Sequence, residues 1–427
     1  MKGIHLISTD WTRSQLEQET NRIFDVCDGC RRCFNLCPSF NTLIDKIDEY
    51  ESNVSKFTAA DYEQVEKECY YCKLCYNHCP YTPPHQYEID FPRLMVAWKK
   101  QRIQEQGVAW RDQLFTQTDL IGKLGGITAS LTNWILSTPW LRVLIEKVVG
   151  LHRDRQVLFF SKESFLQWWR KRAPGKSSSS AQRKVVLFPS CTVNYQATDI
   201  GKATVQVLEK NKIEVVVPDR QRCCSMPSFD IGDTDAMVQT ANHHLKIFQP
   251  YLEKGYDLVV PTPSCSLMFK REYPYLVATP EMNQLAERTF DICEYLMRLK
   301  KEGILSMEFT RAKQRVAYQV PCHLRDQNIG FKSKELIELT GAQVELIEKC
   351  SGHDGSWGAK VEFFDLSMKI AKKAVQPILN SEPDVVASDC PLSALQLDQA
   401  GATPTGKGQT TKHPIQIIRD AYGLAEK

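Results

Sequence analysis

CDGCRRCFNLCP at residues 27–38 and CYYCKLCYNHCP at residues 69–80 each carry four cysteines at the spacing C-x2-C-x2-C-x3-C, and each ends in proline. Three thiolates at positions i, i+3 and i+6 can surround one face of a small metal cluster, with backbone N–H groups turned toward it. The proline ends the turn, because its ring fixes φ and it has no N–H to donate. The two stretches therefore predict two cysteine-ligated centres near the start of the chain.

The spacing is that of bacterial two-cluster iron–sulfur proteins, in which the fourth cysteine of each run ligates the other cluster. A zinc site is less consistent with the pattern, since Cys₄ zinc sites use two separate CxxC pairs. We therefore predict two 4Fe–4S clusters with exchanged fourth ligands. Their ligands are Cys27, Cys30, Cys33 and Cys79 for the first cluster, and Cys69, Cys72, Cys75 and Cys37 for the second.

The composition of the 427-residue chain is that of a globular protein, with 42% hydrophobic and 25% charged residues. Lys plus Arg total 54 against 51 Asp plus Glu, so the net charge of +3 gives no general case for a nucleic-acid partner. The first residues, MKGIHLISTDWTRSQ, have no apolar core of the kind that secretory signals contain. We expect a cytoplasmic protein in which the clustered ones among the 16 cysteines hold metal rather than form disulfides.

Four zones are predicted along the chain. Residues 1–105 contain the two cysteine runs and several helices, and form the two-cluster, ferredoxin-like domain. Residues 106–182 contain no cysteine; they are helical, aromatic and basic, and end in a Gly/Ser linker at 175–180. Residues 183–306 and 307–427 are two copies of one cysteine-rich repeat.

The two repeats share an order of strands, helices and cysteines. Strands are expected at 184–188, 213–217 and 257–260 in the first repeat and at 315–320, 343–347 and 384–387 in the second, with helices at 197–210 and 332–339. Alternating strands and helices predict a parallel α/β fold, in which sites gather at the carboxyl ends of strands. The cysteines that follow these strands are Cys191, Cys223, Cys224 and Cys265 in repeat one, and Cys322, Cys350 and Cys390 in repeat two.

These motifs resemble the group of proteins with duplicated cysteine-rich (CCG) domains. The shared features are Cys191-Thr192-Val193-Asn194-Tyr195, Cys223-Cys224-x-x-Pro227, Cys322-His323 and a CxGxxGxxG motif over 350–358. The group includes one subunit of anaerobic glycerol-3-phosphate dehydrogenase, the iron–sulfur subunits of glycolate and lactate oxidation, and two of the subunits of heterodisulfide reductase. The resemblance implies a further iron–sulfur centre in repeat one and a role in relaying electrons or reducing disulfides.

Repeat two departs from the group's pattern at two positions. Ser351 replaces the second residue of the double cysteine, and Ser393 replaces the last residue of the closing CxxC. A serine hydroxyl is a poor ligand at neutral pH because it is hard to deprotonate. The remaining Cys322, Cys350 and Cys390 would need a fourth donor, for which His353 is the first candidate; His323, Asp354 and Asp389 are also nearby. Repeat two is thus expected to hold zinc, an altered iron centre or no metal.

The middle segment has the composition of a membrane-surface element. Residues 142–176 contain nine Lys/Arg and three Asp/Glu, and tryptophans accompany them. The resembled subunit of glycerol-3-phosphate dehydrogenase is regarded as tying its partners to the membrane. The alternative is a helical subdomain that packs on its neighbours or on a partner protein. Residues 124–141 carry no charge but are too polar to predict a membrane span.

The predicted function is that of an iron–sulfur electron-transfer subunit in a membrane-associated dehydrogenase or reductase complex. No GxGxxG follows a predicted strand near the N-terminus, so the flavin would belong to a partner protein. Electrons would pass to quinone or to a thiol/disulfide acceptor. Two alternatives remain open, a thiol–disulfide reductase acting at repeat one and a redox or oxidative-stress sensor. No catalytic residue is predicted, and Cys293 is interpreted as a core residue because it has no partner at a useful spacing.

Overall fold

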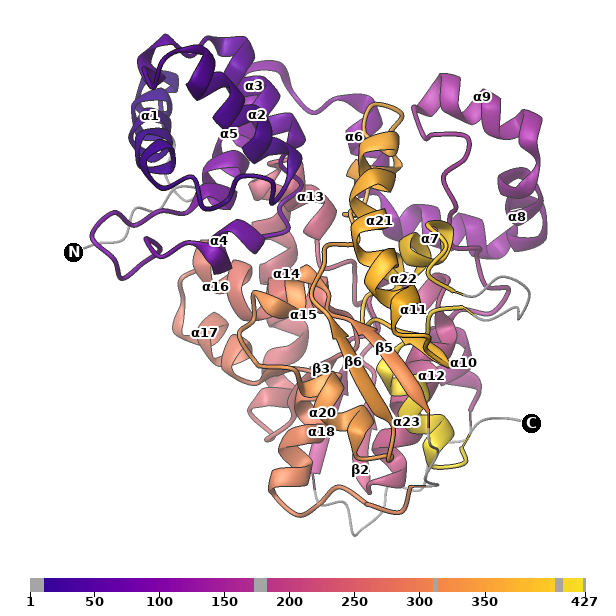
Figure 1. Ribbon diagram of the computed structural model, residues 1–427. Helices are drawn as coiled ribbons and strands as arrows, with labels where there is room; N and C mark the ends of the chain where they lie inside the picture. The colour runs from indigo at the N-terminus through magenta and orange to yellow at the C-terminus, as the bar shows by residue number, and fades with distance from the viewer. Residues whose placement is uncertain (1–10, 173–182, 310–313, 404–409, 425–427) are drawn as a thin grey trace. The chain divides into compact units, whose positions relative to one another are not determined.

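The computed structural model describes residues 11–172, 183–309, 314–403 and 410–424, so the expected linker at 175–180 lies outside the described residues (Figure 1). The chain divides into two compact units. The first comprises residues 1–116 and 225–239, and the second comprises residues 117–224 and 240–427.

Helices build the first unit, and several of them begin at a residue whose side chain caps the helix. Thr12 and Gln15 form a capping box at the start of α1, Thr58 and Asp61 form another at α3, and the Asp90 carboxylate caps α5. The helices are α1 (Arg13–Cys30), α2 (Pro38–Glu49), η1 (Val54–Lys56), α3 (Ala59–Glu68), α4 (Leu74–His78), α5 (Phe91–Gln106), α6 (Trp110–Thr116) and α13 (Met226–Asp230).

Aromatic side chains form the core of this unit. The ring centroids of Phe40 and Phe91 are 4.4 Å apart, those of Phe24 and Phe57 are 5.3 Å apart, and Tyr62 stacks on Trp98 at 5.1 Å. Large rings bury much apolar area per residue, which allows a small helical unit to hold its loops in place.

The inserted segment 225–239 packs tightly within the same unit. The ring of Phe229 meets Tyr71 edge to face at 5.0 Å. Gly232 lies so close to the backbone of Lys99 and Lys100 that an added Cβ would come within 2.5 Å of it. A residue with a side chain is therefore excluded at Gly232, whose φ is also positive at +95°.

Two parallel sheets form the second unit, one from each repeat. The first has the order β2-β1-β3-β4 and the second the order β6-β5-β7, so the shared three strands are arranged identically. Figure 1 shows β5 and β6 side by side. The strands are β1 (Arg183–Leu187), β2 (Ile213–Val216), β3 (Asp257–Val260), β4 (Thr289–Asp291), β5 (Arg315–Gln319), β6 (Gln343–Ile347) and β7 (Val385–Ala387). The predicted α/β fold with a helical N-terminal domain is confirmed, and β4 is an addition that the sequence reasoning missed.

Helices connect the strands and cover the sheets. Within and beside repeat one they are α11 (Cys191–Tyr195), α12 (Thr198–Lys210), α14 (Thr234–Leu252), α15 (Pro263–Leu267), η2 (Met268–Glu272), α16 (Tyr273–Leu276), α17 (Pro280–Glu287) and α18 (Ile292–Lys301). In repeat two they are α19 (Cys322–Arg325), α20 (Lys332–Glu338), η3 (Trp357–Ala359), α21 (Phe364–Asn380), α22 (Pro391–Gln399) and α23 (Pro414–Ala421).

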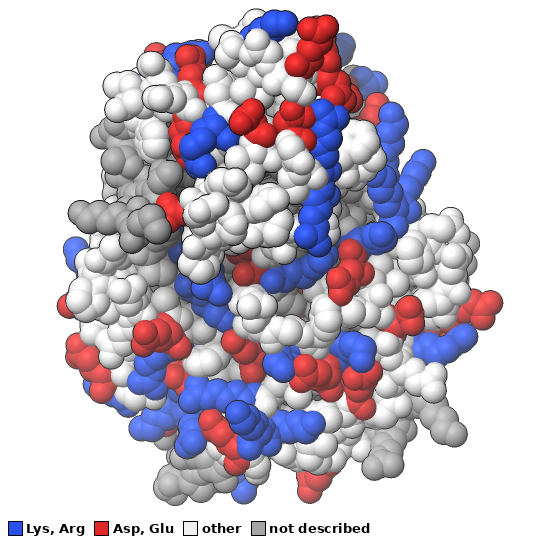
Figure 2. All heavy atoms as spheres, turned by 60° about the vertical axis from the view of Figure 1, so that its left-hand side comes forward, with Lys and Arg blue, Asp and Glu red and all other residues white. Residues whose placement is uncertain are grey.

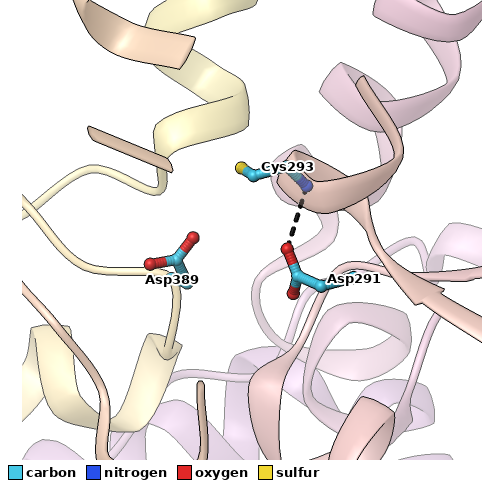
Figure 3. A group of neighbouring side chains, drawn as sticks. All are labelled: Asp291, Cys293 and Asp389. Atoms are coloured by element: carbon cyan, nitrogen blue, oxygen red, sulfur yellow. Dashed lines mark hydrogen bonds between the residues drawn. The ribbon is translucent and has the colours of Figure 1, made fainter. Parts of the chain in front are cut away.

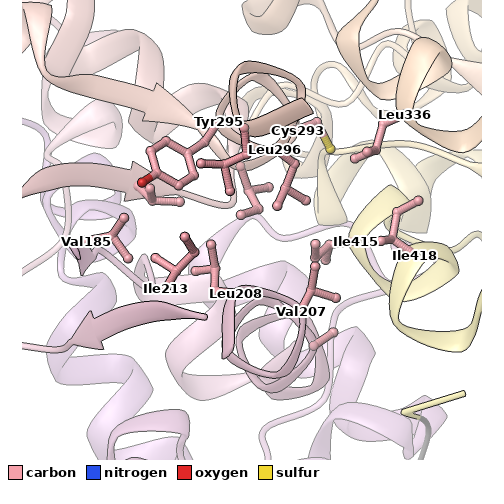
Figure 4. Close-up of a cluster of buried hydrophobic side chains, with 14 of the residues drawn as sticks. Val185, Val207, Leu208, Ile213, Cys293, Tyr295, Leu296, Leu336, Ile415 and Ile418 are labelled. Atoms are coloured by element: carbon pink, nitrogen blue, oxygen red, sulfur yellow. The ribbon is translucent and has the colours of Figure 1, made fainter. Parts of the chain in front are cut away.

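The two repeats share one hydrophobic core. Leu208 of α12 and Leu296 of α18 from repeat one pack in the same cluster as Leu336 of α20, Ile415 and Ile418 of α23 from repeat two (Figure 4). All five side chains are fully buried. Because each repeat completes the core of the other, their relative placement is fixed by apolar burial rather than by a linker.

In the described part of the middle segment, α6 is followed by α7 (Thr118–Ile127), α8 (Ala129–Ser137), α9 (Pro139–Val149) and α10 (Phe165–Lys171). Residues 124–141, the uncharged stretch, are divided among α7, α8 and α9. In the part of the chain that the structure describes, no helix combines the length and apolar character needed to cross a bilayer.

Two basic residues of the middle segment are buried instead of facing solvent, and one of them, Arg155, contacts repeat two. Arg142 donates to the carbonyls of His152 and Arg155, and the buried guanidinium of Arg155 donates to Ser367 and Gln399 at 3.0 Å. The basic face of this segment is therefore smaller than its composition suggests.

Candidate iron–sulfur sites

The first cysteine run begins inside a helix and leaves it through a left-handed turn. Cys27 and Cys30 lie in the last turn of α1, and Arg31 follows with a φ of 47°. In the second run, Lys73 follows Cys72 with a φ of 58°. Both loops thus reverse at the same place, directly after the second cysteine. A left-handed residue between helical ones turns successive N–H groups to one side, which favours an anionic cluster there.

Three thiols of the first run gather with two cysteines of the second. Cys27, Cys30, Cys33, Cys75 and Cys79 all line one hollow of the first unit. Burial, followed by the charges of Cys79 and Cys30, raises the pKa of Cys33 to about 12. Burial also raises the pKa of Cys27, with contributions from Cys33, Cys79 and Cys30. Cys79 is therefore a close neighbour of Cys27 and Cys33.

The thiols of the second run gather with a cysteine of the first. Burial raises the pKa of Cys75 well above its ordinary value, and the neighbouring charges of Cys37 and Cys69 raise it further. Thiols crowded in this way keep their protons unless a cation compensates the thiolate charge. Iron supplies that compensation, so the donor sets fit 4Fe–4S clusters.

Buried lysines lie beside the second run. The Lys99 ammonium donates to the Cys69 carbonyl at 2.9 Å and lies 3.5 Å from the Asp230 carboxylate. Lys73 is only 3% exposed, and its ammonium lies over the rings of Tyr71 and Tyr76. A cluster with four thiolate ligands carries net negative charge, and buried cations stabilise that charge where water cannot.

The four cysteines of repeat one form a continuous chain of sulfur contacts. The Cys191 thiol neighbours Cys223, Cys223 neighbours Cys224, and Cys224 neighbours Cys265. The thiol of Cys223, together with burial, raises the pKa of Cys191 well above its ordinary value. Four thiols from three loops thus converge at the carboxyl ends of β1, β2 and β3, as a cluster site requires.

The middle segment supplies a carboxylate to this group, which the sequence reasoning missed. The Asp119 carboxylate, on α7, accepts a hydrogen bond from the backbone N–H of Cys223 at 2.7 Å. Burial raises the pKa of Asp119. Helix α7 can approach because Gly122 faces the ring of Tyr195 in α11, where an added Cβ would lie 2.2 Å from the ring. In the sequence, the signal for this contact is Gly122, because glycine is uncommon inside a helix.

A buried aromatic side chain supports the double cysteine. The hydroxyl of Tyr273 donates to the Cys224 carbonyl at 2.9 Å, and the ring of His244 lies 3.1 Å from that hydroxyl. Burial lowers the pKa of His244 to about 3, so its imidazole is neutral. These contacts fix the loop that carries Cys223 and Cys224.

Repeat two gathers its three thiols, but Ser393 makes another contact. Burial raises the pKa of Cys322 well above its ordinary value, followed by the charges of Cys350, Asp354 and Cys390. The Ser393 hydroxyl donates instead to the Gln319 side-chain oxygen at 2.8 Å. Ser393 therefore contributes to packing where the group's pattern has a thiolate.

The candidate histidines lie in different surroundings. His353 is buried, its Nδ1 has no hydrogen-bond partner, and burial followed by the charge of Arg155 lowers its pKa to about 3. His323 turns to repeat one, where its Nδ1 lies 2.9 Å from the Ser264 hydroxyl. Of the added donors, Asp354 is the one whose charge affects Cys322 and Cys390.

Comparison with protein families gives the class of the chain. Residues 20–105 match the Citrate utilization protein B Fer4-like domain, and residues 185–270 and 316–398 each match the Cysteine-rich domain. The chain therefore belongs to the iron–sulfur proteins that combine a Fer4-like domain with two cysteine-rich (CCG) domains.

Several relatives are subunits of dehydrogenases and reductases. A subunit of the anaerobic glycerol-3-phosphate dehydrogenase of Escherichia coli K12 is 24% identical over 314 residues, which cover 73% of this chain and 77% of that protein. Lactate utilization protein A of Bacillus pumilus is 28% identical over 218 residues, 48% of this chain and 87% of that protein. A subunit of the fumarate reductase (CoM/CoB) of Methanothermobacter marburgensis is 27% identical over 220 residues, 50% of this chain and 41% of that protein.

The contact between α7 and repeat one can be tested with two glycines of the same helix. We expect Gly122→Ala to lower the free energy of unfolding by about 1–3 kcal/mol, because the new methyl group overlaps the Tyr195 ring. Hydrogen exchange at the Cys223 amide should also become faster, since Asp119 would move away. Chemical unfolding and hydrogen-exchange mass spectrometry measure the two effects.

Gly126→Ala is the matched control. Its added Cβ would meet only the Ser161 carbonyl oxygen, at 3.7 Å. Because alanine favours a helix over glycine by about 1 kcal/mol, this variant should be neutral or more stable. Equal destabilisation by the two substitutions would show that α7 is not seated on Tyr195.

Proposed function

We propose that this protein passes electrons through a series of iron–sulfur centres as one subunit of a dehydrogenase or reductase complex. The observation that supports this most is the grouping of its thiols. All of its cysteines except Cys293 belong to the two N-terminal runs or to the strand-end groups of the two repeats. The relatives are named as subunits of such enzymes, which supports a redox partner protein for this chain.

Two 4Fe–4S clusters with exchanged ligands are proposed for the N-terminal domain. Cys27, Cys30, Cys33 and Cys79 would hold one cluster, and Cys69, Cys72, Cys75 and Cys37 the other. The charge of Cys79 raises the pKa of Cys33, and the charge of Cys37 raises the pKa of Cys75. These effects between the two runs support this assignment.

Double substitutions can test the exchange of ligands through iron content alone. Cys30→Ala with Cys79→Ala should disable one cluster and leave about four irons in the domain, because both residues serve the same cluster. Cys30→Ala with Cys37→Ala should disable both clusters. Iron and acid-labile sulfide, measured on anaerobically purified protein, separate the two cases.

The opposite ranking would contradict the proposal. If each run held its own cluster, the variant with Cys30→Ala and Cys37→Ala would keep one cluster. The variant with Cys30→Ala and Cys79→Ala would lose both. The repeats contribute the same background to both variants, so their difference does not depend on the metal content of the repeats.

Repeat one is proposed as the redox-active half of the cysteine-rich region. Cys191, Cys223, Cys224 and Cys265 would hold a further iron–sulfur centre that receives electrons from the two clusters. Repeat two would hold zinc at Cys322, Cys350 and Cys390, completed by Asp354 or His353, or no metal. Serine at positions 351 and 393 removes two thiolates from that half.

Electron transfer can be measured with a chemically reduced protein and an added acceptor. Cys224→Ala should retain both 4Fe–4S signals in electron paramagnetic resonance but slow their reoxidation by quinone or by a disulfide at least about tenfold. Cys390→Ala is the matched control in repeat two and should reoxidise at the normal rate. Equal rates for Cys224→Ala and the unmodified chain would contradict the proposal.

The choice of acceptor distinguishes the candidate functions. A flavoprotein donor and a quinone acceptor fit an electron-transfer subunit, which we favour because of the similarity to the glycerol-3-phosphate dehydrogenase subunit. Reduction of a disulfide by the purified chain would favour a thiol–disulfide reductase. Loss of clusters in air with no electron transfer to either acceptor would favour a redox sensor.

A membrane surface is proposed as the location, at the inner face of the cytoplasmic membrane. Large apolar side chains of α7, α8 and α9 face solvent, among them Ile127 at 81% exposed and Trp140 at 65%. The others are Leu120, Leu124, Leu131, Trp134, Leu144 and Val148. A soluble surface rarely concentrates so much apolar area, and interfacial helices bind bilayers through such faces.

The face of the molecule drawn in Figure 2 is not dominated by one sign of charge. On the face drawn in Figure 2, acidic and basic side chains are interspersed. With a net charge of +3, attraction to anionic lipid would be local and secondary to apolar insertion.

Flotation with vesicles of phosphatidylglycerol and phosphatidylethanolamine can test this surface. Leu124→Gln combined with Trp140→Gln should lower the bound fraction about tenfold, because two large apolar groups no longer enter the bilayer. Met307→Gln combined with Leu379→Gln changes exposed apolar residues elsewhere in the second unit and is the control. Flotation that is absent, or equally reduced in both variants, would contradict a membrane role for α7–α9.

A further inference from the structure

A buried acidic group joins the two repeats, and one of its members, Asp389, directly precedes Cys390 of repeat two. Asp291, at the end of β4, and Cys293, in α18, belong to repeat one, and Asp389 follows β7 in repeat two. All three side chains are fully buried. One potential ligand atom from each lies within 4.8 Å of the others. Figure 3 shows the three side chains converging on a common space.

One carboxylate oxygen in this group has no partner. Asp291 caps α18, and its Oδ1 accepts from the Cys293 N–H at 2.9 Å. Its Oδ2 is buried and has no hydrogen-bond partner. A buried polar atom without a partner costs free energy, so capping alone does not account for this side chain.

Hydroxyl groups hold the facing carboxylate. Asp389 accepts from the Tyr318 hydroxyl at 2.6 Å and from the Ser333 hydroxyl at 2.5 Å, and Ser333 also contacts the Cys293 thiol. Among the described residues, no Lys or Arg forms an ion pair with Asp291 or Asp389. Two fully buried carboxylates therefore face each other without a basic side chain bonded to either.

We propose that Asp291, Cys293 and Asp389 bind a divalent cation of the zinc class, which links the two repeats. A thiolate with two carboxylates is a donor set that zinc accepts, whereas magnesium and calcium require six or more oxygens. A fourth ligand would come from a water molecule. On binding, the cation displaces the thiol proton and gives the orphaned Oδ2 of Asp291 a partner.

The role of this site is structural and independent of electron transfer. Its ligands come from the end of β4 and the start of α18 in repeat one, and from the segment that follows β7 in repeat two. A cation there stabilises only the arrangement in which both repeats are docked. Its binding free energy therefore adds to the stability of the second unit.

Zinc K-edge absorption on the full-length, anaerobically purified protein tests the proposal directly. The expected result is about one zinc per chain with a single sulfur at about 2.3 Å and oxygen in its other positions. Zinc in the repeat-two group would instead show three sulfurs. Cys322→Ser would remove that second kind of zinc but leave the one-sulfur site.

Asp291→Asn is the decisive variant. Asparagine caps a helix as well as aspartate does, so α18 should be retained while the charge is lost. The one-sulfur zinc should fall to near zero, iron content should stay unchanged, and the unfolding temperature should fall. Asp257→Asn, which alters a buried carboxylate paired with Arg288 at 2.9 Å, is the control and should keep its zinc.

Three results would overturn the proposal. The first is the absence of one-sulfur zinc from protein expressed with added zinc. The second is one-sulfur zinc that the Asp291→Asn variant retains. The third is an Asp291→Asn variant that is as stable as the unmodified chain and that has lost the infrared signal of a protonated carboxyl group, because the two carboxyl groups would then share a proton instead of binding a cation.

Discussion

The shared apolar core between α12, α18, α20 and α23 is the constraint on which the second unit depends. Leu208 and Leu296 from repeat one and Ile415 and Ile418 from repeat two are buried against one another, so neither repeat completes its interior alone. The core orients the strand ends, and the strand ends carry the cysteine loops. Ligands from distant parts of the chain can serve one centre only because this packing holds their loops in register.

Crowded thiols define the chemistry of the protein. Burial and neighbouring sulfurs raise the pKa of Cys33, Cys75 and Cys191, so without a cation these groups stay protonated. A protein that places thiols this close together in apolar surroundings is arranged for a metal centre rather than for solvent exposure. The buried ammonium groups of Lys73 and Lys99 provide further positive charge beside one of these groups.

The middle segment contacts the two repeats through one face and exposes apolar side chains on the other. Inward, Asp119 meets the Cys223 loop through the gap that Gly122 leaves, and Arg155 enters a polar pocket of repeat two. Outward, α7–α9 present leucine and tryptophan side chains to solvent. A perturbation of the outer face could thus reach the Cys223 loop along one helix, since α7 carries both Leu124 and Asp119.

The sequence by itself determined the ligand-bearing segments, the duplication and the α/β class, because cysteine spacing and strand–helix alternation are local patterns. The replacement of two cysteines in repeat two, at Ser351 and Ser393, is also visible in the sequence. Only the tertiary structure brought Asp119 to Cys223, turned His323 to Ser264, and buried Arg142 and Arg155. The sequence predicted Cys293 as a core residue without a partner, whereas the tertiary structure places it beside Asp291 and Asp389. These contacts join residues tens to hundreds of positions apart, and long-range packing leaves no periodic signal in the chain from which they could be inferred.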